Sequence, residues 1–279
     1  MKNVRLHVSA DVVLSVAALD GSMVSRVLGE PPIFDDPSSY VLSLTFADMR
    51  MNGRSLSNLM NHHVFSYGGA PLKDLQVTIV DGRLSQKGKL HKGVWLPFSM
   101  NAAVDATPDG RLRLRAQSMS ALGVPAKSLL DLVGVELGDL LHIASGHGVT
   151  VEGDDVIIVP GRALPPPTTE GRLARAAVEG MELRMVFGDR PRNVPTASSS
   201  GNYIRFTGST IRFGKLTMNG TDLQLIDTDP RDPFDFFPAR YNAQLVAGYS
   251  KNTPELGLRT FMPDFNDLGP GVNLIPRSQ

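Results

Sequence analysis

The chain has 279 residues, and its 28 Lys and Arg balance its 28 Asp and Glu, so its formal net charge is zero. Because dedicated nucleic-acid-binding proteins usually carry an excess of basic residues, we expect no nucleic-acid partner. The chain has no Cys, which excludes disulfide bonds and thiolate sites, and its 42% hydrophobic and 20% charged residues are typical of a globular protein.

The first residues alternate between apolar and polar side chains, which predicts a half-buried strand over residues 4–12. Asp20-Gly21 then predicts a turn. The proline-rich residues 30–37 predict a connection on the surface. A second alternating run over residues 40–46 predicts another strand.

From Gly53 onward the apolar residues recur at helical spacing, which predicts a short amphipathic helix that buries Leu56, Leu59 and Val64. Ser55 is placed to cap its first turn. The cluster Gly68-Gly69-Ala70-Pro71 cannot continue the helix and predicts its end.

Four alternating runs between residues 75 and 116 follow, with the turn sequences Asp81-Gly82 and Pro108-Asp109-Gly110 among them. The short connections predict an antiparallel meander with one apolar face. Arg111, Arg113 and Arg115 fall on its opposite face. We expect them to face solvent, with contact to anionic lipid headgroups as the alternative.

A second amphipathic helix is predicted to begin near Pro125. Further strands are predicted over residues 149–159, 181–187 and 203–225, and irregular chain from Pro230 onward. We therefore predict a domain over residues 1–187, a flexible loop over 188–201, and additional strands with an irregular tail over 202–279, packed on the same domain. The predicted fold class is strand-dominated α+β, with a curved antiparallel sheet packed on two amphipathic helices.

Few residues point to catalysis or to metal binding. Asp227, Asp229 and Asp232 begin like a calcium-binding loop, but the glycine and the bidentate glutamate of such a loop are missing. Calcium at these residues therefore stays a weak alternative. Sequence motifs for nucleophilic catalysis and for phosphate binding are absent. A hydrolase-like enzyme that uses the carboxylates of residues 222–235 with a histidine stays open as a second function, and no cofactor is expected.

A resemblance to a known family covers about a third of the chain. The run Val77-Thr78-Ile79-Val80-Asp81-Gly82-Arg83-Leu84, the later Asp109-Gly110-Arg111-Leu112-Arg113-Leu114, and Gly123-Val124-Pro125 before the leucine-rich helix resemble bacterial phospholipid-binding proteins of the tubular lipid-binding (TULIP-like) type. The resemblance implies a helix held in a bent antiparallel sheet that shields a lipid tail, without catalysis. It also implies a location outside the cytoplasm behind a leader, whereas the alternation of the first residues predicts a strand there.

These observations together predict a protein that binds a lipid or another hydrophobic ligand, with possible transfer between membranes and peripheral membrane contact. A structural or partner-binding protein is the remaining alternative. No stretch is apolar enough to span a bilayer. The compartment is therefore periplasmic if a leader was removed and cytoplasmic otherwise, and the oligomeric state stays open. We expect the ligand in an apolar groove between the sheet and the second helix. Its predicted lining is Leu75, Val77, Ile79, Leu96, Phe98, Met100, Leu112 and Leu114 on the strands, facing Leu129, Val133 and Leu137 on the helix.

Overall fold

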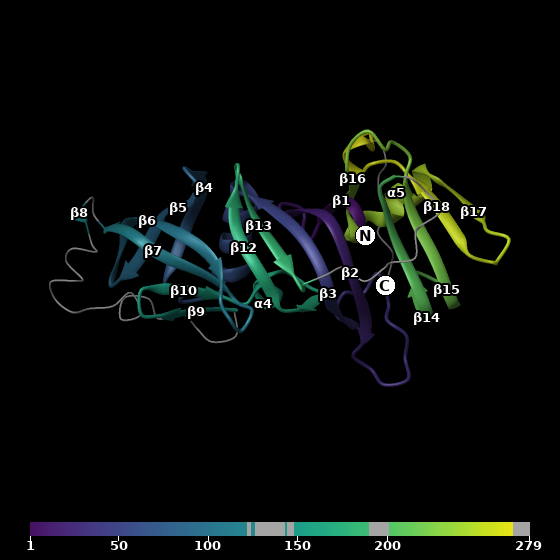
Figure 1. The fold of residues 1–279 in the computed structure, drawn as a ribbon, viewed down its shortest axis with the longest axis horizontal. Coiled ribbons are helices and arrows are strands. Elements are labelled where there is room, and N and C mark those ends of the chain that lie inside the picture. Colours follow the sequence, from purple (N-terminus) through teal and green to yellow (C-terminus); the bar gives the residue numbers. More distant parts are fainter. Residues whose placement is uncertain (122–123, 126–142, 144–147, 190–200, 270–279) are drawn as a thin grey trace.

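The computed structural model describes residues 1–121, 124–125, 143, 148–189 and 201–269. These residues form two large sheets that lie end to end in an elongated molecule, with the seven-stranded sheet at one end and the carboxyl-terminal strands at the other (Figure 1). The strand-dominated α+β fold class is confirmed. Within the described part of the chain, no helix has both the length and the apolar character that crossing a membrane requires.

The eleven-stranded sheet is mixed and joins both ends of the chain. Along its main path the order is β12 (Leu173–Glu179), β13 (Glu182–Phe187), β3 (Tyr40–Asn52), β2 (Val13–Ser25), β1 (Lys2–His7), β14 (Tyr203–Phe213), β15 (Leu216–Asp227), β18 (Leu258–Met262) and β17 (Tyr249–Asn252). Two short strands join it in parallel, β11 (Thr168–Glu170) beside β3 and β16 (Phe234–Phe236) beside β1.

The seven-stranded sheet is an antiparallel meander, β4 to β7, with three added strands. Its order is β4 (Leu72–Val80), β5 (Arg83–Lys92), β6 (Val94–Ala106), β7 (Leu112–Ala121), β10 (Asp155–Ile158) and β9 (Val149–Glu152), with β8 (Val124–Pro125) beside β7. Asp81 and Gly82 both adopt positive φ, 49° and 71°, in the turn between β4 and β5. Such a pair of left-handed residues suits a tight hairpin, so the predicted turn and the predicted meander are confirmed.

The predicted first helix is confirmed, and its cap differs from the prediction. It consists of α1 (Gly53–Leu59) followed by the π-helical η1 (Met60–Val64), with Leu56, Leu59 and Val64 buried. The capping side chain is Asn52, whose Oδ1 accepts from the Ser55 N–H at 2.9 Å. The helix packs against β4 and β3 and joins the two sheets.

Two other predictions about the chain are wrong. Asp20-Gly21 is not a turn, because it lies within β2, where the pairing with β3 shifts register. The chain after Pro230 is not irregular throughout, because it forms β16, η2 (Pro238–Arg240), α5 (Tyr241–Ala247), β17, β18 and η3 (Phe265–Asp267). Gln244 of α5 organises this part, since its fully buried amide donates to the carbonyl oxygens of Asp235 and Pro263, both at 2.9 Å.

Several predicted features lie outside the described residues. These are nearly all of the second helix, most of the loop predicted over residues 188–201, and the last ten residues. Val124 and Pro125 themselves belong to β8. A one-turn helix, α4 (Pro160–Ala163), follows β10 and leads to β11. The division of the chain at residues 188–201 stays a prediction, and the strands β14, β15 and β18 beyond it join the same sheet as β1, β2 and β3.

Candidate functional site

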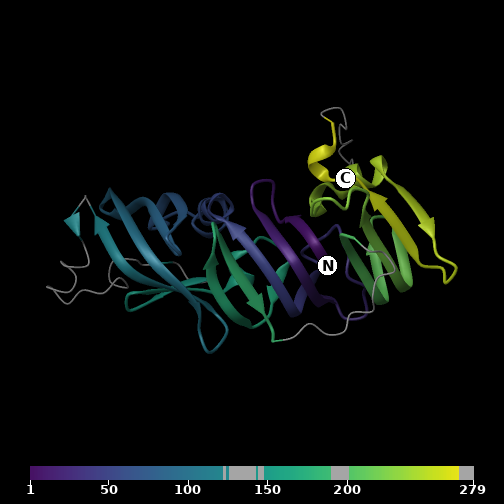
Figure 2. The ribbon, with the colours of Figure 1, turned by 45° about the horizontal axis from the view of Figure 1, so that its top comes forward.

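A cavity of about 1130 Å³ lies in the eleven-stranded sheet where β2 and β14 diverge. At the top of this gap β1 joins the two strands, because Lys2 pairs with Ala18 of β2 and with Tyr203 of β14. Past these residues β2 and β14 both continue, and the described residues include no strand pairing between them. Figure 2 shows the amino terminus at this point, between the purple strands and the green ones. We call the space below it the central cavity.

Both the faces and the edges of the strands line the central cavity. Every residue of 17–23 on β2 and of 203–211 on β14 borders it. Because successive side chains of a strand point to opposite faces, one face alone would contribute only every second residue. A ligand in the central cavity therefore meets strand backbone as well as side chains.

Apolar side chains supply most of the lining. Met23 of β2 and Leu42 of β3 lie opposite each other, and both are only half-buried. The other large apolar and aromatic residues of the lining are Met1, Leu6, Val8, Leu19, Phe34, Tyr40, Phe46, Tyr203, Ile204, Phe206, Ile211, Phe236 and Phe237. Typical small-molecule pockets have volumes of roughly 300–1,000 Å³. The central cavity is therefore large enough for a ligand with a long hydrocarbon chain.

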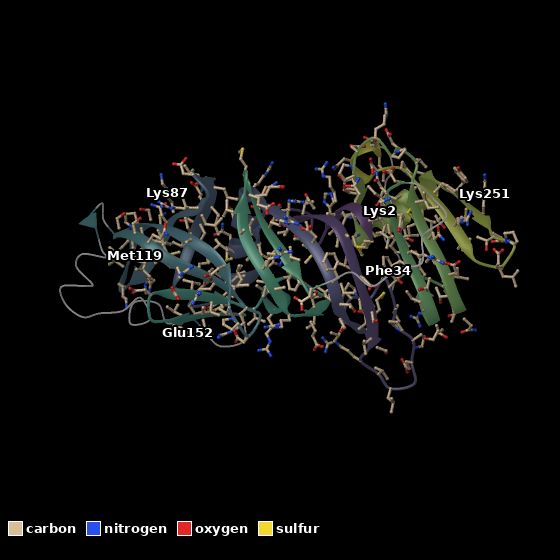
Figure 3. All side chains as sticks on the ribbon, in the orientation of Figure 1. Lys2, Phe34, Lys87, Met119, Glu152 and Lys251 are labelled. Atoms are coloured by element: carbon tan, nitrogen blue, oxygen red, sulfur yellow. The ribbon has the colours of Figure 1, made fainter. Side chains whose placement is uncertain are left out.

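The segment between β2 and β3 closes the central cavity at its lower end. Ile33 forms a parallel bridge with Arg212 of β14. Next to it, Phe34 is buried and stacks on Phe213 with 4.4 Å between the ring centroids, while Tyr241 meets it edge to face at 5.5 Å. In Figure 3, Phe34 lies between the two halves of the molecule, below Lys2. This aromatic packing holds Phe34 in place as part of the cavity wall.

Charged side chains border the same space. Lys2, Asp20, Asp35 and Arg205 all belong to the lining. Arg205 is already engaged, since its Nε donates to Asp222 Oδ1 at 3.0 Å, whereas the Lys2 side chain is exposed. An apolar interior with charged groups in its lining suits an amphiphile that carries both a hydrocarbon part and a polar part.

A buried polar cluster adjoins the central cavity at β1. His7 belongs to the cavity lining, and its Nε2 lies 2.5 Å from Asp235 Oδ1. The Asp235 backbone N–H donates to Asp264 Oδ1 at 2.7 Å, and Asn266 donates to the Asp235 carboxylate. Burial, with the nearby carboxylates adding to it, raises the pKa of Asp264 to about 7. The cluster ties β1, β16 and η3 together beside the cavity.

The strand residues of the predicted groove share one face of the seven-stranded sheet. Val77 and Met100 both pair with Gln86, which places them on the same face. Leu75, Val77, Met100, Leu112 and Leu114 are buried, and Ile79, Leu96 and Phe98 are half-buried. Leu129, Val133 and Leu137, the predicted opposite wall, lie outside the described residues. The structure thus assembles the predicted sheet face, and the groove itself stays a prediction.

The arginines on the opposite face of this sheet are engaged in ion pairs. Arg113 holds Asp105 in a two-pronged contact at 2.8 and 2.9 Å, and Arg115 reaches the same carboxylate at 2.6 Å. Arg111 pairs with Glu152 at 2.7 Å. Figure 3 shows Glu152 along the lower edge of this sheet. These carboxylates balance most of the positive charge of this strand face.

The three aspartates considered for calcium binding, Asp227, Asp229 and Asp232, form hydrogen bonds or ion pairs with other groups of the chain. Asp227 accepts from Asn202 Nδ2 at 2.8 Å and from the Asp229 N–H at 2.7 Å. Asp229 pairs with Arg231, which lowers the pKa of Asp229 to about 2, and Asp232 offers its backbone carbonyl to Asn202. Among the described residues, no group of three or more His, Asp or Glu is arranged to hold a metal ion. The carboxylates shape a turn here.

None of the residues that line the central cavity was predicted as a site residue. The sequence predicted only that several of them lie in strands. One signal in the sequence was available. A Cβ at Gly21 would lie 2.5 Å from the Ser43 carbonyl oxygen, so this glycine permits close approach of β3 at a register shift. A glycine inside an alternating run often marks such an irregularity rather than a turn.

Comparison with known proteins adds no relative. No protein-family model, no curated protein and no solved structure matches the chain.

Proposed function

We propose that the protein binds a lipid or another hydrophobic ligand in the central cavity and releases it chemically unchanged. The observation that carries this proposal is the large volume of the cavity together with its mainly apolar lining. Each methylene group that leaves water contributes about 0.8 kcal/mol. A single acyl chain in this space would thus gain enough to offset the ordering of the ligand.

The proposed orientation of the ligand follows from the distribution of charge. Its hydrocarbon part lies against Met23, Leu42 and Phe34, and its polar part lies near Lys2 and Arg205. Because the strand edges border the cavity, polar atoms of the ligand also have backbone donors and acceptors within reach.

The proposal is tested by mass spectrometry of the purified chain under native conditions, followed by organic extraction of any bound molecule. Met23→Glu places a charge in the cavity and is expected to abolish co-purification of the ligand, because burying a lone carboxylate beside a hydrocarbon is costly. Val24→Glu is the matched control. Val24 is the next residue of the same strand, is 51% exposed and is not part of the lining.

A second measurement uses a pyrene-labelled fatty acid added to the delipidated protein. We expect saturable binding to the original chain and to Val24→Glu, and at least tenfold weaker binding to Met23→Glu, since one buried, unpaired charge costs several kcal/mol. Equal binding by all three chains would place the ligand outside the central cavity. Absence of both co-purified ligand and probe binding would refute the proposed function.

A further inference from the structure

The β4–β5–β6 end of the seven-stranded sheet carries an excess of positive charge. Residues 72–98 contain five Lys and Arg against two Asp, in a chain whose total charge is zero. This stretch lies at the opposite end of the molecule from β17 and β18 (Figure 1). Compensating negative charge therefore lies elsewhere, and this end attracts anions.

Strand pairing gathers these cations on one face. Lys73 lies opposite Lys89, and Lys87 lies opposite Gln76 and Ser99. Arg83, Lys87 and Lys89 alternate along β5 with the buried Leu84 and Leu90, so they face away from the apolar side of the sheet. Figure 3 shows Lys87 at the outer margin of this sheet.

The arrangement is unfavourable in the isolated protein. Like charges directly opposite each other on a sheet destabilise it, and Lys73 and Lys89 form such a pair. Asp74 offsets part of this cost through its 2.8 Å contact with Lys89 Nζ. On β7, Arg113 and Arg115 both pair with the Asp105 carboxylate. An anionic surface against β5 would remove the remaining repulsion.

Apolar groups project from the same end. At the turn between β5 and β6, Val94 is 61% exposed and Trp95 is 39% exposed. The Trp95 ring has Lys73 Nζ over it at 4.1 Å from the centroid, and the His91 ring beside it at 4.9 Å. Tryptophan beside lysine is the composition found where proteins contact the interfacial region of a bilayer.

We infer that this end docks on an anionic lipid bilayer through Lys73, Arg83, Lys87, Lys89, Val94 and Trp95, which we call the hairpin patch. Lysines approach the lipid phosphates while Val94 and the Trp95 ring enter the headgroup region. A bilayer is favoured over a nucleic acid because the tip offers an exposed aliphatic side chain next to the aromatic one. The inference goes beyond the proposed function, since the hairpin patch does not overlap the central cavity.

Trp95 makes the test direct, because it is the only tryptophan in the chain. Vesicles of phosphatidylcholine, with and without phosphatidylglycerol, are titrated into the full chain while the intrinsic fluorescence is recorded. We expect a blue shift and increased emission with the anionic vesicles only, and weaker binding as salt is added. Brominated acyl chains in the same vesicles should quench the emission.

The double variant Lys87→Gln/Lys89→Gln is expected to lower partition onto the anionic vesicles by roughly thirty-fold, from the usual contribution of each lysine near a charged bilayer. Lys215→Gln/Lys251→Gln is the matched control, because it removes the same charge from exposed positions in the β14–β15 turn and in β17, at the other end of the molecule (Figure 1). Lys87→Arg/Lys89→Arg keeps the charge and should retain binding. Circular dichroism of all variants confirms their folding.

Three results would overturn the inference: equal partition of the Gln double variant and the control, unchanged Trp95 emission on bound vesicles, or binding of a single-stranded oligonucleotide in preference to the vesicles. The outcomes for the two proposals are separable. The hairpin-patch variant should still carry the ligand of the central cavity, and Met23→Glu should still bind the vesicles.

Discussion

The two sheets of this protein are assembled from contacts of very different range along the sequence. In the seven-stranded sheet, β4 to β7 follow one another through short turns and pair along most of their length. In the eleven-stranded sheet, β1 meets β14 only at Lys2 and Tyr203. Sequential hairpins thus leave a continuous surface, whereas a joint between distant segments is partial and leaves the central cavity beside it.

The largest effect is expected where the long-range joint is packed. Phe236 of β16 is fully buried, lies beside Leu6 of β1 and borders the central cavity. Phe236→Ala should lower the free energy of unfolding by about 3–5 kcal/mol, because it removes a buried aromatic ring from a closely packed core. Urea unfolding measures this change. The control is Leu216→Ala, at a half-exposed position of β15, which should change the free energy of unfolding by under about 0.5 kcal/mol. Equal losses in the two variants would show that the joint at Phe236 contributes no special stability.

The polar cluster at the same joint should make stability depend on pH. The pKa of Asp264 is raised from 3.8 to about 7, so the folded chain keeps a proton that the unfolded chain releases in this interval. Stability should therefore fall as the pH rises from about 4 to 7. Asp264→Asn should flatten this dependence and stabilise the protein at pH 8 by roughly 2–4 kcal/mol. Urea unfolding at several pH values checks this, and an unchanged slope would contradict it.

A smaller effect is expected at the helix that joins the two sheets. The Asn52 side chain caps α1 by accepting from the Ser55 N–H. Asn52→Ala should lower stability by about 1 kcal/mol, since it leaves this backbone donor without its partner. Asn52→Asp preserves an acceptor and should retain stability. Thermal unfolding of the two variants distinguishes a cap from a side chain that merely occupies the position.

The smallest effect is expected on the charged face of the seven-stranded sheet. Hydrogen bonding from Arg113, with the charge of Arg115 adding to it, lowers the pKa of Asp105. The stabilisation is therefore present above the usual pKa of an aspartate and is lost as the pH falls through the lowered value. Asp105→Asn should cost under about 1 kcal/mol near neutral pH and less in high salt, as is usual for partly exposed pairs. If the loss of stability in Asp105→Asn did not depend on the salt concentration, the ion pairs with Arg113 and Arg115 would not be its cause.

The sequence was sufficient for features that depend on neighbouring residues. Asp81-Gly82 identified a hairpin because two adjacent residues had to adopt positive φ. The spacing of Leu56, Leu59 and Val64 identified the first helix for the same reason, since one turn of helix fixes which residues share a face. The strand face predicted to line a groove was recovered as one surface on the same grounds.

Features that depend on distant partners were not predictable in this way. Asp20-Gly21 has the composition of a turn, and only the register of β2 against β3 keeps it extended. The tail after Pro230 is rich in Pro and Asp, and only the burial of Phe234 and Gln244 among distant strands orders it. To predict the central cavity, one must know that β1 pairs with β14 only at Lys2 and Tyr203. No local sequence pattern contains this information.

The divergence of β2 and β14 also bears on solubility. A strand edge with unpaired backbone groups is a template on which other molecules add further strands and aggregate. Here the two edges below Lys2 look toward each other across the central cavity, and Ile33 and Phe34 cover their far end. The sheet therefore turns these two edges toward the central cavity and toward each other, which leaves less room for a second sheet to align with them.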